Sequence, residues 1–254
     1  MTKTVILEWD FSPPNYFEEH IEISRENYVM SIDTGKVTAT IDYAIFNENP
    51  SLREELQESL NNRFLGVQVI SHAPYELSNS KMIHIDADGH KHIFLELSTA
   101  VLKMTAGNID LQLKDKDGNI ISDSKQDRVE KKKSLAELVA TRKPSNPLVA
   151  ALLNSYQTAV RDPNNELVHL YEIREGISAK FGGENTARRN LSVSSSQWSR
   201  LGQLCNNEPL KQGRHRGKTI GNLRDASEAE LTEAREISRI MIVAYLQYLE
   251  NPNI

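Results

Sequence analysis

The residue types best suited to chemistry gather in one short stretch, Leu210–Gly217, which reads Leu-Lys-Gln-Gly-Arg-His-Arg-Gly. An imidazole changes its charge near neutral pH, so His215 could take up or release a proton. Arginine and lysine bind phosphate, and the glycines allow the backbone to approach a ligand closely. The stretch therefore predicts a phosphate-binding loop that cleaves RNA without a metal ion, with His215 as general acid or base.

We assign a role to each polar side chain in and just after this stretch. Lys211 and Arg214 would act in catalysis beside His215, by holding the phosphate and neutralising the charge that builds on it. Four further side chains would bind the substrate: Gln212, Arg216, Lys218 and Arg224. A simpler interpretation stays open, in which the loop is solvated and its cations cap helix ends or pair with acids of the last predicted helix. Those acids are Glu228, Glu230 and Glu233.

The basic character extends beyond the loop. The segment Arg188–Arg224 contains eight cations and one acid, Glu208, which gives it a net charge of +7. The whole chain of 254 residues has a net charge of −5, so the remainder carries −12. This asymmetry indicates one segment suited to an anion on an acidic chain, and it excludes binding of nucleic acid through bulk positive charge alone.

Other candidate sites are weaker. Three histidines and two aspartates surround one predicted hairpin: His84, His90, His92, Asp86 and Asp88. A metal site is one interpretation of this group, and ordinary exposed strand residues are the favoured one. The run Asp115–Gly118 begins like a calcium loop, but its glycine comes too early for an EF-hand, so we predict a turn. The single cysteine, Cys205, excludes an intramolecular disulfide and a zinc site built from cysteines. We expect no metal and no cofactor.

The elements that would position these residues change character halfway along the chain. The first half shows the apolar–polar alternation of strands, beginning with Val5–Trp9, and Val67 with Val69 predicts a further strand. Asp-Gly pairs and a Thr-Gly pair supply the positive φ that tight hairpins need. The predicted hairpin turns lie at 33–36, 86–89 and 115–119. We therefore predict a mostly antiparallel sheet.

Two helices accompany these strands. The first begins after Ser51, and one of its faces is lined by Leu52, Leu56 and Leu60. The second is charged and covers about 125–143, and we expect three consecutive lysines on it to be exposed: Lys131, Lys132 and Lys133. The prolines of the run 143–147 then mark the domain boundary. We place a β-rich domain, for sensing or for binding an unknown partner, at 1–143 and a helical domain at 144–254.

The second half has the periodicity and end signals of a helical bundle. Asn146 caps the first helix and Pro147 begins it, and Gly182-Gly183 ends the second. A short helix is predicted at 184–191, and another begins after the serines at 194–196. Ser227 and Glu230 form a capping box for the last helix. The fold class is thus α+β, with the sheet domain first and the all-α bundle second.

The sequence also bears on where the protein works. No signal peptide and no transmembrane span is visible along the chain, and a single cysteine suits a reducing compartment. We therefore expect a cytoplasmic protein that does not associate with a membrane.

From about Pro147 to Leu249 the chain resembles a HEPN domain, the helical fold of many prokaryotic RNases and toxins. The resemblance rests on the order of elements: long helices carrying Leu170–Glu175, a helix with Trp198, the basic histidine segment, and a closing helix with Tyr245 and Tyr248. An N-terminal β domain followed by such a bundle is similar to abortive-infection proteins of the ApeA type.

The catalytic motif of the HEPN family is an arginine, a polar residue, three to five further residues and a histidine. Lys211, Gln212 and His215 match it most closely, with lysine in place of arginine and a spacing one residue short. The resemblance implies a metal-independent endoribonuclease, such as a toxin or phage-defence effector. It also implies a homodimer in which the motifs of two copies face one groove. Family members without activity imply the alternative, a non-catalytic module that binds nucleic acid, a nucleotide or a protein partner.

Overall fold

The computed structural model describes residues 3–88, 90–94, 110–114, 119–218 and 221–250. Its contacts divide the chain into two compact units, one formed by 1–67 with 75–136 and the other by 68–74 with 137–254. The second unit thus includes 68–74 and 137–143, although the sequence pattern predicts a first domain of 1–143. One reason is a hydrogen bond within the second unit, from the Tyr156 hydroxyl to Val69 O (3.2 Å).

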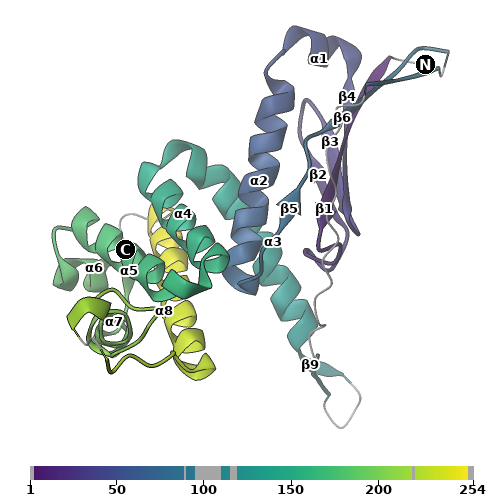
Figure 1. Cartoon of the computed structure of the whole chain (residues 1–254). Helices are drawn as coiled ribbons and strands as arrows, with labels where there is room; N and C mark the ends of the chain where they lie inside the picture. Colours follow the sequence, from purple (N-terminus) through teal and green to yellow (C-terminus); the bar gives the residue numbers. More distant parts are fainter. Residues whose placement is uncertain (1–2, 89, 95–109, 115–118, 219–220, 251–254) are drawn as a thin grey trace. The chain divides into compact units, whose positions relative to one another are not determined.

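The α+β architecture predicted from the sequence is confirmed, with an antiparallel sheet first and helices after it (Figure 1). The described strands of the main sheet are β1 (Thr4–Ser12), β2 (Ile21–Ser24), β3 (Val29–Asp33), β4 (Lys36–Asp42), β5 (Glu76–Leu77), β6 (Lys81–Ile85) and β7 (Lys91–Phe94). They are ordered β2-β3-β4-β1-β6-β7, and β5 also pairs with β1. The first predicted hairpin joins β3 to β4, where Asp33 pairs with Lys36 and Gly35 has a φ of 74°. The second joins β6 to β7, where Ile85 pairs with Lys91.

One face of the sheet forms the core of the first unit. Alternate residues of β1 are buried, Trp9 and Phe11 among them. Two helices follow β4: α1 (Tyr43–Glu48) and α2 (Leu52–Ser71). Figure 1 shows α2 running along the sheet, and the Phe11 and Phe64 rings meet edge to face at 5.1 Å. The predicted apolar face of this helix is confirmed, since Leu56 and Leu60 are buried.

The strand predicted at Val67 and Val69 is wrong, because both residues belong to the last turns of α2. Valine favours strands by intrinsic propensity, but tertiary packing overrides this preference. Both valines are buried, and Gly66 lies so close to the next long helix that an added Cβ would be 2.7 Å from Leu135 O. The helix therefore continues through a fully buried stretch.

A second, two-stranded sheet precedes the charged helix. It consists of β8 (Gln112–Lys114) and β9 (Ile120–Asp123), which form the third predicted hairpin, although its turn at 115–118 lies outside the described residues. The charged helix is α3 (Ser124–Arg142), as predicted. Its lysines are not all exposed: Lys132 is buried, donates to Tyr16 O (3.0 Å) and pairs with Glu18. The expectation failed because the acid that binds this ammonium lies far away in the sequence.

The helices of the second unit lie close to the bounds that the sequence signals predict. They are α4 (Pro147–Arg161), α5 (Glu166–Lys180), α6 (Glu184–Leu191), α7 (Ser195–Gly202) and α8 (Glu228–Glu250), with 3-10 turns η1 (Lys143–Ser145), η2 (Pro163–Asn165) and η4 (Arg216–Lys218) and a π-helical turn η3 (Gln203–Asn207). Asn146 Oδ1 accepts from Val149 N (3.1 Å), and Ser227 exchanges hydrogen bonds with Glu230. Gly182 and Gly183 follow α5 with positive φ angles.

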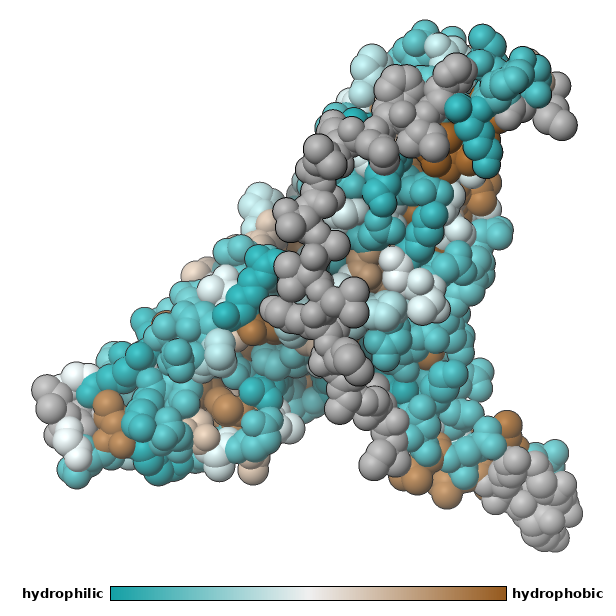
Figure 2. All heavy atoms as spheres, turned by 45° about the vertical axis from the view of Figure 1, so that its right-hand side comes forward, coloured by the Kyte–Doolittle hydropathy of each residue, from teal (hydrophilic) through white to brown (hydrophobic). Residues whose placement is uncertain are grey.

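The core of the second unit is aromatic and aliphatic, and its helix α5 packs against both α4 and α8. Tyr156, Trp198 and Tyr245 are buried. On the face shown in Figure 2 hydrophilic side chains predominate, and hydrophobic ones gather only in small groups. Within the described ranges, no helix combines the length and the apolar character needed to cross a membrane.

Candidate functional site

The basic loop predicted between the last two helices is present, and its own backbone anchors it. A parallel bridge joins its two ends, in which Lys211 N donates to Arg224 O (2.9 Å). Between them, Arg214 N donates to Cys205 O (2.8 Å) in η3. Gly213 packs so closely here that an added Cβ would lie 3.0 Å from Cys205 O. The glycine therefore serves the close approach of two backbone segments rather than of a ligand.

Of the three residues that match the HEPN motif, the first two have partners just before α8. Lys211 Nζ pairs with Asp225 Oδ2 (2.9 Å), and Gln212 Oε1 accepts from Ala226 N (3.0 Å). Both contacts tie the start of the loop to the residues just before α8. His215 is exposed and forms no hydrogen bond with any residue that the structure describes. No carboxylate in this part of the structure therefore fixes the tautomer or the orientation of its ring.

Arg214 lies over an aromatic ring. Its Nη1 donates to Glu175 Oε1 (2.7 Å), which raises the pKa of Arg214, and its guanidinium carbon is 4.5 Å from the Tyr171 ring centre. Arg174 contacts the same ring at 5.2 Å and Trp198 at 5.3 Å. Tyr171 and Trp198 are both buried, so neither offers a free face to a base.

Arg216 has a structural role in the loop. Its Nε donates to Gly213 O (2.8 Å), and its Nη2 contacts Asn165 Oδ1 at the start of α5. The guanidinium therefore fastens the loop to the helix behind it. The side chain of Lys218 lies outside the described residues.

Arg224 forms the best-aligned ion pair of the loop. Its Nη1 and Nη2 donate to the two carboxylate oxygens of Glu230, both at 2.7 Å. These bonds, together with that from Ser227 N, lower the pKa of Glu230 to about 2. The Arg224 side chain is nevertheless 48% exposed, and that of Lys211 is 54% exposed. A pair that is exposed on both sides, such as that of Lys211 with Asp225, exchanges with solvent ions at little cost.

The loop can therefore do less chemistry than its composition suggests. Its exposed cations, Lys211, Arg214 and Arg224, each hold an acid of the same unit, and one free imidazole lies among them. The distances show a surface of exchangeable ion pairs. In this arrangement the side chains of Lys211, Arg214 and Arg224 are held by acids, and none of these contacts involves His215.

Sequence reasoning missed a buried charge cluster in the same unit. Glu166, the first residue of α5, has a side chain that is 2% exposed. It accepts from Arg235 Nε (2.6 Å) and Nη2 (2.9 Å), and His72 Nε2 lies 3.3 Å away. Burial alone would raise the pKa of Glu166, but the bonds from Arg235 and His72 outweigh it and lower that pKa. His72 Nδ1 also lies 3.2 Å from the Tyr156 hydroxyl.

A sequence signal for this cluster existed. Glu166 precedes Leu170, Ile173 and Ile177 at the spacing of the buried stripe of α5. A carboxylate in line with core residues needs a cation, because an unpaired buried charge is costly. The identity of that cation could not be read from the sequence, since Arg235 and His72 are far from Glu166 along the chain.

At the other candidate sites, the described side chains form neither a metal site nor an activated nucleophile. His90 Nδ1 pairs with Asp88 (2.7 Å) and both are exposed, while the His92 side chain lies outside the described residues. Across the described ranges, no three His, Cys, Asp or Glu side chains are grouped closely enough to hold a metal ion. Cys205 is buried, which raises the pKa of its thiol to about 12. That thiol is therefore a poor nucleophile.

Comparison with known proteins adds no relative. No family model matches the chain, and neither a curated protein nor a solved structure does so. Its function has to be inferred from the geometry and the charges described above.

Proposed function

We propose that the helical unit is a HEPN-like module that binds a phosphate-bearing ligand, RNA in the first place, through the loop 210–226 without cutting it. The observation that carries this proposal is the set of exposed, ion-paired cations around a free imidazole: Lys211, Arg214, Arg224 and His215. A ligand of this kind is met in the cytoplasm, where we place the protein, and a role in phage defence is consistent with it.

The exposure of the pairs supports binding. A surface ion pair is worth only about 0–1 kcal/mol, so a phosphate can replace Asp225 or Glu175 as the partner of a loop cation. A polyphosphate chain replaces several acids at once and releases its condensed counterions, which gives a net gain. The loop cations Lys211 and Arg214 then become available to the ligand.

The placement of the motif residues argues against cleavage. Lys211 and Gln212 are engaged with Asp225 and Ala226, and His215 has no described group to orient it. An ammonium also lacks the planar fork with which arginine clamps a phosphate. Of the two functions that the resemblance implies, we therefore favour the binding module over the endoribonuclease.

The family's two-fold assembly forms part of the proposal. Two copies facing one groove would present two such loops to a single RNA strand. Charge repulsion between the two loops is modest while the acids of each loop stay paired with its cations. Once RNA displaces these acids, its phosphates compensate the repulsion.

Purified protein incubated with labelled RNA in EDTA tests the proposal. We expect binding that weakens steeply with salt, no cleavage, and a shallower salt dependence in Lys211→Ala and Arg224→Ala. RNA cleavage that disappears in His215→Ala, with binding retained, would establish the endoribonuclease instead. Salt-independent binding, or no binding, would show that the loop does not bind a phosphate-bearing ligand. Light scattering with and without RNA measures the assembly.

A further inference from the structure

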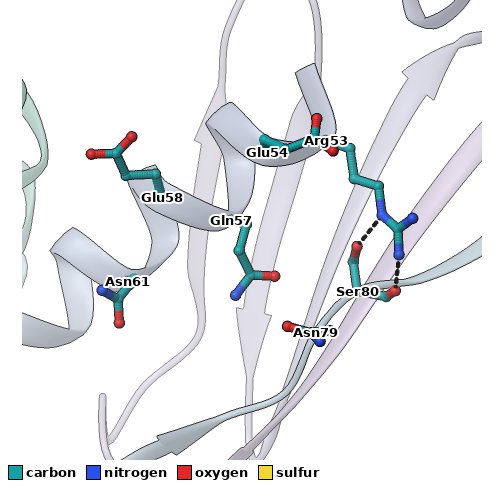
Figure 3. Close-up of a pocket in the computed structure, with 7 residues that line it drawn as sticks. All are labelled: Arg53, Glu54, Gln57, Glu58, Asn61, Asn79 and Ser80. Atoms are coloured by element: carbon teal, nitrogen blue, oxygen red, sulfur yellow. Dashed lines mark hydrogen bonds between the residues drawn. The ribbon is translucent and has the colours of Figure 1, made fainter. Parts of the chain in front are cut away.

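A polar cavity of about 510 Å³ lies in the first unit, between the N-terminal half of α2 and the β5–β6 connection (Figure 3). Its lining residues come from two places, Arg53, Glu54, Gln57, Glu58 and Asn61 on α2 and Asn79 with Ser80 on the connection. No aromatic or aliphatic side chain is among them. A volume in this range suits a small molecule, and a polar lining selects a polar one.

The floor of the cavity is held in place by the unit's own contacts. Arg53, Gln57 and Asn61 are four residues apart, so they follow one stripe of α2. Arg53 Nε and Nη2 donate to Ser80 Oγ (2.8 Å) and Ser80 O (2.7 Å), which closes one end, as Figure 3 shows. This stripe needs no rearrangement to receive a ligand, and such preorganisation favours binding.

Two amides of the floor present donors to the cavity. Trp9 Nε1 donates to Gln57 Oε1 (2.6 Å), and because an indole can only donate, the Gln57 amide must turn its Nε2 the other way. That Nε2 donates one hydrogen to Ser78 O (3.4 Å), which leaves its second amide hydrogen for a ligand. The Tyr75 hydroxyl donates to Asn61 Oδ1 (2.8 Å), which likewise leaves the Asn61 Nδ2 without a described acceptor. Both groups suit an oxygen on a ligand.

The rim of the cavity carries negative charge. Glu54 and Glu58 follow the neighbouring stripe of α2, and within the described residues neither carboxylate has an ion-pair partner. Like charges four residues apart destabilise a helix slightly. A cation bound beside them would remove that repulsion, and the Asn79 amide on the opposite side could accept from it or donate to it.

We propose that this cavity binds a small polar amine, a molecule whose ammonium group faces Glu54 and Glu58 and whose oxygen atoms accept from the Gln57 and Asn61 amides. An amino sugar has this chemistry, and the cavity has room for it. The proposal does not depend on RNA binding by the helical unit, because all of its residues lie in the first unit.

Calorimetric titration of the full chain with D-glucosamine tests the proposal, with D-glucose and N-acetyl-D-glucosamine as matched ligands that lack the charge. We expect glucosamine to bind at least about tenfold more tightly than either neutral sugar. Equal affinities for the three sugars, or no heat up to millimolar glucosamine, would overturn the proposal. Complete competition by Mg²⁺ would also overturn it, since it would assign the carboxylates to a metal.

The variant Glu54→Gln/Glu58→Gln isolates the role of the rim. Both side chains are exposed and the replacements keep their shape, so thermal unfolding should be unchanged. We expect glucosamine affinity to fall at least about tenfold. Glu26→Gln, which removes an exposed charge that does not line the cavity, should leave the affinity as it is. An unchanged glucosamine affinity in the double variant contradicts the proposal.

Asn79→Ala should weaken the binding of all three sugars alike. An unchanged affinity in this variant would contradict the contact between the ligand and Asn79.

Discussion

Two charged regions of the helical unit differ in every respect except composition. In the basic loop, arginine and lysine meet carboxylates at the surface, as in the pair of Arg224 with Glu230. Around Glu166, the same types of group meet in the core, where the carboxylate accepts two hydrogen bonds from Arg235 and one contact from His72. A buried pair cannot exchange its partner for a solvent ion, whereas an exposed pair can. The first arrangement therefore suits ligand binding and the second suits structural stability.

The largest expected effect comes from breaking the buried pair. Arg235→Leu leaves the Glu166 carboxylate without its main partner inside the protein, and such losses cost about 3–5 kcal/mol. Urea unfolding followed by circular dichroism measures the change. Arg224→Leu is the matched control, since it removes an exposed arginine that also donates two hydrogen bonds to one carboxylate, and its loss should be clearly smaller. Equal losses of unfolding free energy in the two variants would show that the buried and the exposed pair contribute alike to stability.

The next effect is a dependence of stability on pH. The pKa of Glu166 is lowered in the folded protein, so its contribution is fully present above the unfolded value of about 4.3 and is lost as the pH falls through the folded pKa. We expect Glu166→Gln to be destabilised at neutral pH and the gap to the unmodified protein to narrow in acid. The midpoint of urea unfolding between neutral pH and pH values below about 4 tests this. A gap that widens in acid would show that the carboxylate does not stabilise the fold.

A smaller effect is expected in the loop, where removing an acid should strengthen RNA binding. Asp225→Asn releases Lys211 from its pair and makes its ammonium available to phosphate. We expect affinity to rise a few-fold at low salt and the gain to vanish at high salt. Fluorescence anisotropy with labelled RNA measures both. Glu26→Gln removes the same charge far from the loop in sequence and should change RNA affinity little. An equal gain in this variant would show that the effect comes from net charge alone.

The smallest effect should be on stability in the loop itself. Lys211→Met removes an exposed partner of Asp225 and leaves no buried charge behind. The unfolding midpoint should therefore stay where it is, while RNA affinity falls. A large loss of stability would indicate that the loop, like the region around Glu166, serves the fold.

The elements that sequence predicts well are those whose signals are local. Asn146 with Pro147 starts α4, and Ser227 with Glu230 starts α8, because a cap needs only residues within one turn. The pattern at Val67 and Val69 predicts a strand because it carries no sign of the long-range packing there: the adjacent Gly66 lies against Leu135 of α3, more than sixty residues further along the chain. Tertiary contacts of this kind leave no local trace.

The candidate site was predictable in composition and not in geometry. The sequence places Lys211, Arg214 and His215 in one loop, and the structure has that loop. Which acids bind its cations depends on the course of the chain, since Glu175 belongs to α5 and lies 39 residues before Arg214. A cluster of charges in a sequence therefore predicts the place of a binding surface better than the arrangement of its side chains.

The assignment of residues 68–74 to the helical unit has a practical consequence for anyone who studies that unit in isolation. A gene fragment that encodes only 144–254 would omit His72, a neighbour of both Glu166 and Tyr156, and the Val69 carbonyl that accepts from Tyr156. The shortened polypeptide would then expose a tyrosine hydroxyl and a carboxylate edge that the intact protein covers. Its failure to fold would say nothing about its capacity to bind RNA.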